Sequence, residues 1–204
     1  MELNKKQAEK INHTLGNRPM NKQEEETILK GLQTLLKVTG RTMDEGVEET
    51  PYRMMKALLE GTRGYDEDPR KHLEKTFDVH CDDLVVVKDI DFTSYCEHHV
   101  MPFFGKVHIA YIPGKRITGL SKFGRLVDGY AKRLQVQERL TQDIANAIEE
   151  VLEPAAVAVY IEAEHTCMTL RGIAKPGAKT VTTVYKGSFA YNTDLRKEFL
   201  NMIK

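Results

Sequence analysis

The chain has 204 residues, of which 41% are hydrophobic and 29% are charged, so it can bury a core of ordinary size. Its 30 Lys and Arg side chains balance 30 Asp and Glu side chains, which gives no overall field for binding a nucleic acid or an anionic membrane. Three widely spaced cysteines, with no apolar leader and no apolar run of membrane length, predict a globular cytoplasmic protein rather than a secreted or membrane protein.

The N-terminal part of the chain divides into a polar stretch and a helical region. Residues 1–20 are polar and aperiodic, which predicts a flexible lead-in. In the helical region, residues 21–80, apolar side chains recur at helical spacing over 22–38. A second helix is expected over 50–61, with Thr50 as its N-cap.

Residues 81–204 predict an α+β domain with the element order β-β-α-α-β-β. Stretches rich in β-branched and aromatic residues predict four strands, near 84–92, 103–112, 156–170 and 180–189. Apolar repeats predict two amphipathic helices between the second and third strands, over 123–134 and 140–152. This order predicts an antiparallel four-stranded sheet covered by helices on one face. Oligomerisation would protect the remaining face and edges.

Two short strings contain metal-binding residue types: Cys-Glu-His-His, starting at Cys96, and His-Thr-Cys, ending at Cys167. Zinc binds thiolate and imidazole ligands, and a catalytic zinc keeps about three protein ligands and an open position. Cys96, His99 and Cys167 would form such a set. His98 would then be free for proton transfer. If the strand continues through residue 170, His165 and Cys167 share one face and His165 lies beside the metal.

The same residues also fit other sites. A structural zinc with His165 as the fourth ligand would use both strings and leave no open position. Unliganded core and surface side chains are a third reading. Spacing alone does not separate these alternatives.

A possible anion site begins the first internal helix. Ser121 could cap this helix, and Lys122 and Arg125 would lie on one side of it, close to the free N–H groups. An ordinary capped helix with solvated charges fits the same residues. No Walker-type phosphate loop occurs in the sequence.

A possible base-binding pair, Gln137 and Glu138, lies at the start of the second internal helix. A carboxylate accepts two parallel hydrogen bonds, which matches the N1–H and exocyclic amine of guanine, so Glu138 could distinguish guanine from adenine. A glutamate at a helix start is also favoured simply by the helix dipole.

Four strings carry a resemblance to a known family: Cys-Glu-His-His at 96–99, Gly-Leu-Ser-Lys at 119–122, Gln-Val-Gln-Glu-Arg-Leu-Thr at 135–141, and His-Thr-Cys at 165–167 followed by Arg171-Gly172. Their order and separation resemble GTP cyclohydrolase I, from about Glu24 to the C-terminus. The family hydrolyses the imidazole ring of GTP at C8, releases formate and forms 7,8-dihydroneopterin triphosphate, the first step of pterin and tetrahydrofolate synthesis.

The resemblance implies a role for each matched residue. It implies Zn2+ bound by Cys96, His99 and Cys167, with proton transfer by His98 and His165. The implied guanine contacts are Glu138 and Gln137. The implied phosphate and ribose contacts are Ser121, Lys122, Arg125, Arg171 and Arg53.

The resemblance also implies the tunnelling fold and a ring-shaped homodecamer with active sites between subunits. It assigns no role to Cys81 or to the lead-in. Two rival hypotheses remain. One is a structural module stabilised by zinc. The other is the nitrile reductase of queuosine synthesis, which shares the fold but uses a cysteine nucleophile with NADPH and lacks the zinc ligands.

Overall fold

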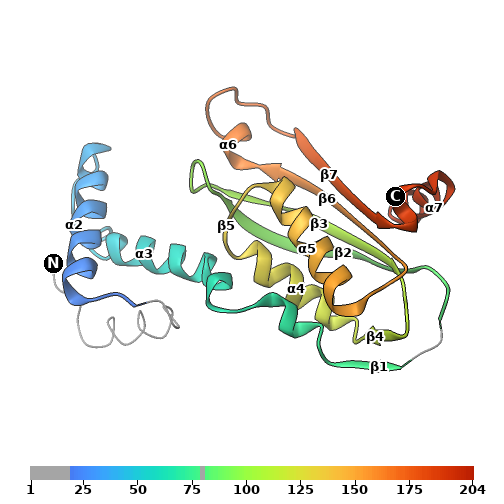
Figure 1. The fold of residues 1–204 in the computed structure, drawn as a ribbon. Helices are drawn as coiled ribbons and strands as arrows, with labels where there is room; N and C mark the ends of the chain where they lie inside the picture. Colours follow the sequence, from blue (N-terminus) through green and yellow to red (C-terminus); the bar gives the residue numbers. More distant parts are fainter. Residues whose placement is uncertain (1–18, 79–80) are drawn as a thin grey trace. The chain divides into compact units, whose positions relative to one another are not determined.

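The computed structural model describes residues 19–78 and 81–204 (Figure 1). The chain divides into two compact units, one ending at Asp66 and the other running from Glu67 to Lys204. The predicted lead-in lies almost wholly outside the described residues. None of the described helices is long and apolar enough to cross a membrane.

The smaller unit contains the two predicted helices, α2 (Lys22–Val38) and α3 (Thr50–Gly61), followed by the 3-10 turn η1 (Arg63–Asp66). The start of α2 is fixed by a capping box, in which Asn21 and Glu24 exchange side-chain to backbone hydrogen bonds of 3.0 and 2.8 Å. The two helices pack through a small apolar cluster formed by Leu29, Tyr52 and Met55.

The prediction that Thr50 caps α3 is wrong. Glu49 occupies the N-cap position, with an αR backbone and no side-chain hydrogen bond, and Thr50 is the first helical residue. The proline at Pro51 explains the position of this start, because a proline in the first turn lacks an N–H group that would be unpaired there anyway.

The larger unit contains all the strands. Its helices and turns are η2 (Pro69–His72), α4 (Ser121–Ala131), α5 (Gln137–Leu152), α6 (Thr166–Thr169), η3 (Ser188–Ala190) and α7 (Thr193–Met202). Its strands are β1 (Thr76–Asp78), β2 (Val85–Cys96), β3 (Pro102–Ile112), β4 (Arg116–Thr118), β5 (Leu134–Gln135), β6 (Ala156–His165) and β7 (Lys179–Gly187).

The main sheet has five strands in the order β5-β2-β3-β6-β7, one more than predicted. The four predicted strands pair antiparallel, which confirms that part of the prediction. The additional strand, β5, pairs parallel to the end of β2, with Cys96 opposite Gln135. A separate pair joins β1 to β4, so this segment of the predicted helical region 21–80 is part of the larger unit.

Two helices, α4 and α5, cover one face of the main sheet (Figure 1). Side chains alternate between the two faces of a strand, so every second residue of β3 and β6 points to these helices. The buried layer between them includes Phe123, Leu126, Ile144, Ile148, Val107, Ile109, Val159 and Ile161.

The C-terminal helix α7 covers part of the opposite face. Its Phe199 packs with Phe189 of η3, and both rings join Ala110 and Ala158 of the sheet in one buried cluster. The sequence did not predict this helix. The large rings of Phe189 and Phe199 thus pack against small alanine side chains of the sheet.

Strands β3 and β6 approach very closely at Gly105. A Cβ atom at this position would lie 1.9 Å from the carbonyl oxygen of Glu162 and 2.7 Å from Cα of Ala163. No side chain fits in that space without moving the backbone of β6. Glycine is therefore required at this point of the sheet.

Strand β2 carries a bulge in its pairing with β3, between Val87 and Ile90. Asp89, within the bulge, has a left-handed backbone with φ of 61°. Its N–H group donates to Nδ1 of the buried His108 on β3, at 3.3 Å. The imidazole thus accepts a hydrogen bond from a backbone N–H group that the bulge removes from the β2–β3 pairing.

Candidate functional site

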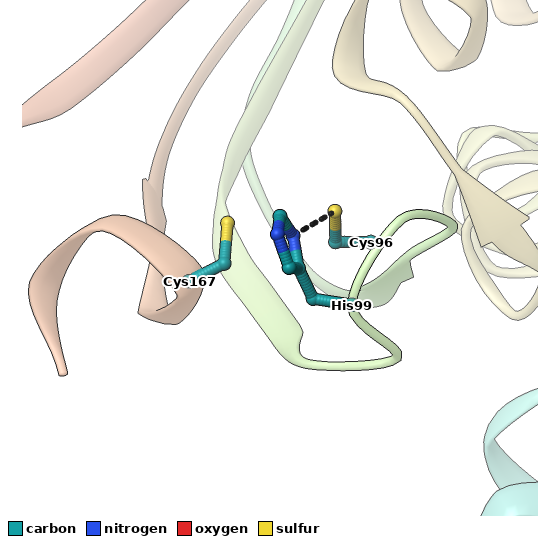
Figure 2. A group of neighbouring side chains, drawn as sticks. All are labelled: Cys96, His99 and Cys167. Carbon is teal, nitrogen blue, oxygen red and sulfur yellow. Dashed lines mark hydrogen bonds between the residues drawn. The ribbon is translucent and has the colours of Figure 1, made fainter. Parts of the chain in front are cut away.

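A tight loop between β2 and β3 carries the Cys-Glu-His-His string. Cys96 donates its N–H to Met101 O, and its own carbonyl accepts from the N–H of Val100, both at 2.8 Å. Val100 has φ of 52°, an unfavourable conformation for a β-branched residue. This closed turn folds His99 back onto Cys96, and the Cys96 Sγ to His99 Nδ1 distance is 3.6 Å (Figure 2).

The third predicted ligand, Cys167, lies in α6, just beyond β6 (Figure 2). The prediction of a strand through residue 170 is wrong, because β6 ends at His165 and the chain then makes a helical turn. Thr166 fixes this turn by donating its hydroxyl to Pro102 O at 2.6 Å. The turn, and not strand alternation, therefore brings the Cys167 side chain toward the loop of Cys96.

The ligand atoms of Cys96, His99 and Cys167 all lie within 4.8 Å of one another. Within 19–78 and 81–204, no other group of three or more His, Cys, Asp or Glu residues has this geometry. Burial raises the pKa of the Cys167 thiol, and the neighbouring Cys96 raises it further. Two adjacent thiols of this kind become stable thiolates when a soft cation binds between them, so the donor set fits a zinc-type ion.

His98 lies near the same cysteine, although the sequence predicted that it would point elsewhere. Its Nδ1 is 3.7 Å from Cys96 Sγ, and its side chain is largely exposed. It is not a member of the three-residue group. The exposed ring is accessible from solvent and lies next to the cluster.

The other predicted proton-transfer residue, His165, contacts Gln137 at the start of α5. The His165 Nε2 to Gln137 Oε1 distance is 2.8 Å. The His165 ring also stacks on Phe103, with centroids 4.5 Å apart and planes 5° from parallel. Burial lowers the pKa of His165, and the Glu138 carboxylate acts in the opposite direction.

Three residues of this site were missed by sequence reasoning: Phe103, Glu97 and Arg139. Arg139 on α5 pairs with Glu97 of the cysteine loop, and its Nε donates to Gln135 Oε1 at 3.0 Å. The Glu97 N–H donates to Gln135 O, also at 3.0 Å. The loop of Cys96 and the start of α5 are thus fastened together through β5. Glu97 and Arg139 lie within two of the four strings that resemble the family, so their sequence positions already linked them to the site.

The predicted base-binding pair has two very different environments. Glu138 is exposed, whereas Gln137 is buried and its side-chain amide already has protein partners. The expected contact of Gln137 with guanine stays a prediction.

The predicted anion-binding residues are on several elements. Ser121, Lys122 and Arg125 lie in the first turns of α4. The prediction that Ser121 caps this helix is wrong, because Leu120 occupies the N-cap position without a side-chain hydrogen bond. The Lys122 N–H donates to Gly119 O at 2.8 Å, so the chain is already turning before Ser121.

The two remaining predicted arginines differ in their surroundings. Arg171 is exposed, just after α6, and its charge acts to lower the pKa of the Cys167 thiol. Arg53 belongs to α3 in the smaller unit, where its guanidinium pairs with Glu49 at 2.9 Å.

Comparison with known proteins identifies relatives over most of the chain. A family model described as GTP cyclohydrolase I matches residues 28–204. GTP cyclohydrolase 1 of Clostridium perfringens (strain 13 / Type A) is 49% identical over 181 residues, covering 88% of this chain and 98% of that protein. GTP cyclohydrolase 1 of Bacillus mycoides (strain KBAB4) is 53% identical over 161 residues, covering 78% of this chain and 85% of that protein.

Among solved structures, the apo form of the archaeosine synthase QueF-Like aligns with a TM-score of 0.44 and 21% identity, covering 52% of this chain and 94% of that one. A likeness of this size bears on neither fold nor function. The match to the family model, together with relatives that are 49% and 53% identical in sequence, shows that the chain belongs to the GTP cyclohydrolase I family.

Proposed function

We propose that this chain hydrolyses the imidazole ring of GTP at C8, releases formate and rearranges the product to 7,8-dihydroneopterin triphosphate, at the start of pterin and tetrahydrofolate synthesis. Membership of a family of hydrolases supports this reaction. The single observation that carries it is the group of Cys96, His99 and Cys167, whose ligand atoms lie within 4.8 Å of one another. Cys96 pairs with Gln135, two residues before Gln137, and His165 lies two residues before Cys167, which supports a reaction centre shared with the Gln137–His165 pair.

The three ligands suit a zinc ion with one position left open. When bound, zinc supplies a nucleophilic water at neutral pH, because it lowers the pKa of that water from 15.7 to about 7. A closed structural site would need His165 as its fourth ligand. The described geometry supports the open site, because His165 does not belong to the group of residues whose ligand atoms lie within 4.8 Å of one another.

The residues that the family resemblance implies would bind and orient the nucleotide. His165 and His98 would move protons, since an imidazole exchanges protons near neutral pH. Glu138 would accept the two guanine donors. Contacts with the triphosphate and ribose are assigned to Ser121, Lys122, Arg125, Arg171 and Arg53.

We also assign to the chain the tunnelling fold, a ring-shaped homodecamer with active sites between subunits, and a cytoplasmic location. Exposed apolar side chains on the segment after α6 support the assembly. Leu170 is 73% exposed and Ile173 is 64% exposed. Such residues next to a metal cluster suit a subunit contact that would enclose the site.

The test is to incubate the purified protein with GTP and to measure formate and the pterin chromophore, with ATP as the control nucleotide. Chelation should abolish both products, and added zinc should restore them. Circular dichroism should be unchanged by chelation if the metal serves chemistry. Unfolding after mild chelation would instead support a structural zinc, and no formate from the zinc-loaded protein would overturn the proposed reaction.

A further inference from the structure

The amide of Gln137 is buried and fully hydrogen-bonded, with 1% of the residue exposed. Its Nε2 lies 3.1 Å from Ile161 O, 3.1 Å from Thr180 O and 3.0 Å from Thr182 Oγ1. Two of these partners are backbone carbonyls, which can only accept. The nitrogen of the amide must therefore face them, because the reversed amide would place its oxygen against two other oxygens.

A ring of hydrogen bonds fixes the same orientation independently. Thr141 donates its hydroxyl to Gln137 O at 2.6 Å. The proton of Thr141 is thereby used, so the contact of 2.7 Å between the two hydroxyls must have Thr182 as its donor. Thr182 Oγ1 is then left to accept from Gln137 Nε2. Both arguments direct the amide oxygen of Gln137 toward His165.

This orientation determines which nitrogen of His165 carries the proton. The Gln137 oxygen only accepts, so the partner at 2.8 Å, His165 Nε2, must donate. The neutral ring then has its lone pair on Nδ1. The stack on Phe103, with planes 5° from parallel, fixes the tilt of the ring, and the hydrogen bond fixes its rotation within that plane.

We infer that Gln137 is a positioning residue, which holds His165 in the Nε2–H form and leaves Nδ1 as the atom that exchanges a proton during the reaction. This inference rests on the proposed function, because it assigns a proton-transfer role to His165. It replaces the expected guanine contact for the Gln137 side chain and leaves the base to Glu138.

The kinetic test is the substitution Gln137→Met in the zinc-loaded protein, which keeps the side-chain length and removes the amide. We expect kcat to fall by about 10- to 100-fold, with KM for GTP and zinc content unchanged. The matched control is Gln142→Met on the same helix, where the exposed amide bonds only to Asn146 at 2.7 Å, and kcat should be retained. A raised KM with normal kcat would mean that Gln137 binds the base and would overturn the inference.

A measurement on the unsubstituted protein keeps the inference testable if Gln137→Met does not fold. Solid-state NMR of the zinc-loaded protein, labelled with 15N at its seven histidines, reports the tautomer of each neutral ring. At pH 8 the signal that is lost in His165→Asn should belong to a ring protonated at Nε2. A ring protonated at Nδ1 would overturn the inference. If the protein released no formate from GTP, the proposed function would fall, while the tautomer would still test the hydrogen-bond argument.

Discussion

Glu138 and Gln137 are neighbours at the start of α5, yet one is exposed and the other is buried. The buried amide has its hydrogen bonds within the protein, whereas the exposed carboxylate is available for a ligand. At the scale of single residues, base recognition is therefore expected to depend on Glu138.

The substitution Glu138→Ala should weaken GTP binding by at least about 1–3 kcal/mol, because two guanine donors would lose their acceptor in a desolvated site. Isothermal titration of GTP into the zinc-loaded protein measures this change. Glu149→Ala, an exposed carboxylate near the other end of the same helix, is the control and should bind normally. An unchanged dissociation constant for Glu138→Ala would remove this residue from the site.

The histidines should separate into a metal ligand and proton-transfer residues. His99→Ala should lose zinc, whereas His165→Ala should keep zinc and GTP affinity but lose about 10²- to 10⁴-fold in rate. His98→Ala should also keep zinc, with slower turnover. Metal analysis combined with single-turnover formate release measures both properties. Zinc lost from His165→Ala but kept in His99→Ala would contradict the ligand assignment.

At the scale of elements, Gly105 and Gly124 provide a matched pair of glycine positions. Gly105→Ala should destabilise the protein by about 1–3 kcal/mol or more, because the new Cβ would overlap the backbone of β6. Gly124→Ala lies within α4 and would meet nothing within 4 Å, so about 0.5–1 kcal/mol of stabilisation is expected. Urea unfolding at one fixed protein concentration measures both changes. Equal effects in the two variants would contradict the close approach of β3 and β6.

The bulge of β2 should make stability depend on pH through His108. Burial lowers the pKa of His108; Asp89 and Glu162 oppose this shift, while Lys88 and Lys106 add to it. In the unfolded chain an imidazole binds its proton near pH 6.5. The stability contributed by the neutral ring is therefore complete above about pH 6.5 and is lost as the pH falls below it.

The measurement is the free energy of unfolding between pH 7.5 and pH 5, for the native chain and for His108→Asn. The native chain should lose up to about 1.4 kcal/mol per pH unit more than the variant, because one proton is taken up on unfolding. Identical slopes would mean that His108 does not control this dependence.

The longer elements could be predicted from the sequence, and the shorter ones could not. The helices α2, α4 and α5 have apolar repeats of several turns, α3 has a proline that marks its first turn, and the structure confirms all four helices. Strand β5 has only two residues, too few for any periodicity, and its pairing with β2 depends on a distant segment. The predicted strand ran past the end of β6 because Thr166 and Thr169 in the following turn are β-branched residues that also suit a strand.

The site was predictable in its chemistry but not in its internal contacts. Spacing within two strings was enough to propose three metal ligands, and the structure brings them together. The partner of His165 was not predictable, because nothing in the sequence distinguishes a buried Gln137 from an exposed one. Burial at the first turn of α5 is decided by β6 and β7, whose carbonyls surround the amide.

At the scale of the whole molecule, exposed apolar side chains favour the proposed assembly. Tyr191 is 79% exposed, in addition to Leu170 and Ile173. Among the described residues, β2 has a strand on its outer edge only at its last two positions, opposite β5. An open strand edge of this length is normally covered in a stable protein.

The native mass should therefore be a large multiple of 23.3 kDa. Ile173→Asp should dissociate the assembly and reduce activity, because a charge would be buried in a subunit contact. Lys175→Asp introduces the same side chain two residues further on and should leave the mass unchanged. Sedimentation velocity combined with a formate assay measures both variants, and a fully active monomer would contradict the proposed ring.

The arrangement of the ligands in the sheet also bears on how the chain reaches its native state. Cys96 ends β2 and Cys167 follows β6, and β3 runs between these two strands. The β2–β3 hairpin is a local contact, whereas pairing of β6 with β3 requires the chain to close a long loop and is therefore expected to be slower. A nascent or partly folded chain therefore holds two of the three ligands and lacks the third. The complete ligand set is therefore expected only after β6 has paired with β3, so a chain that holds a metal ion at all three ligands has already joined β2, β3 and β6.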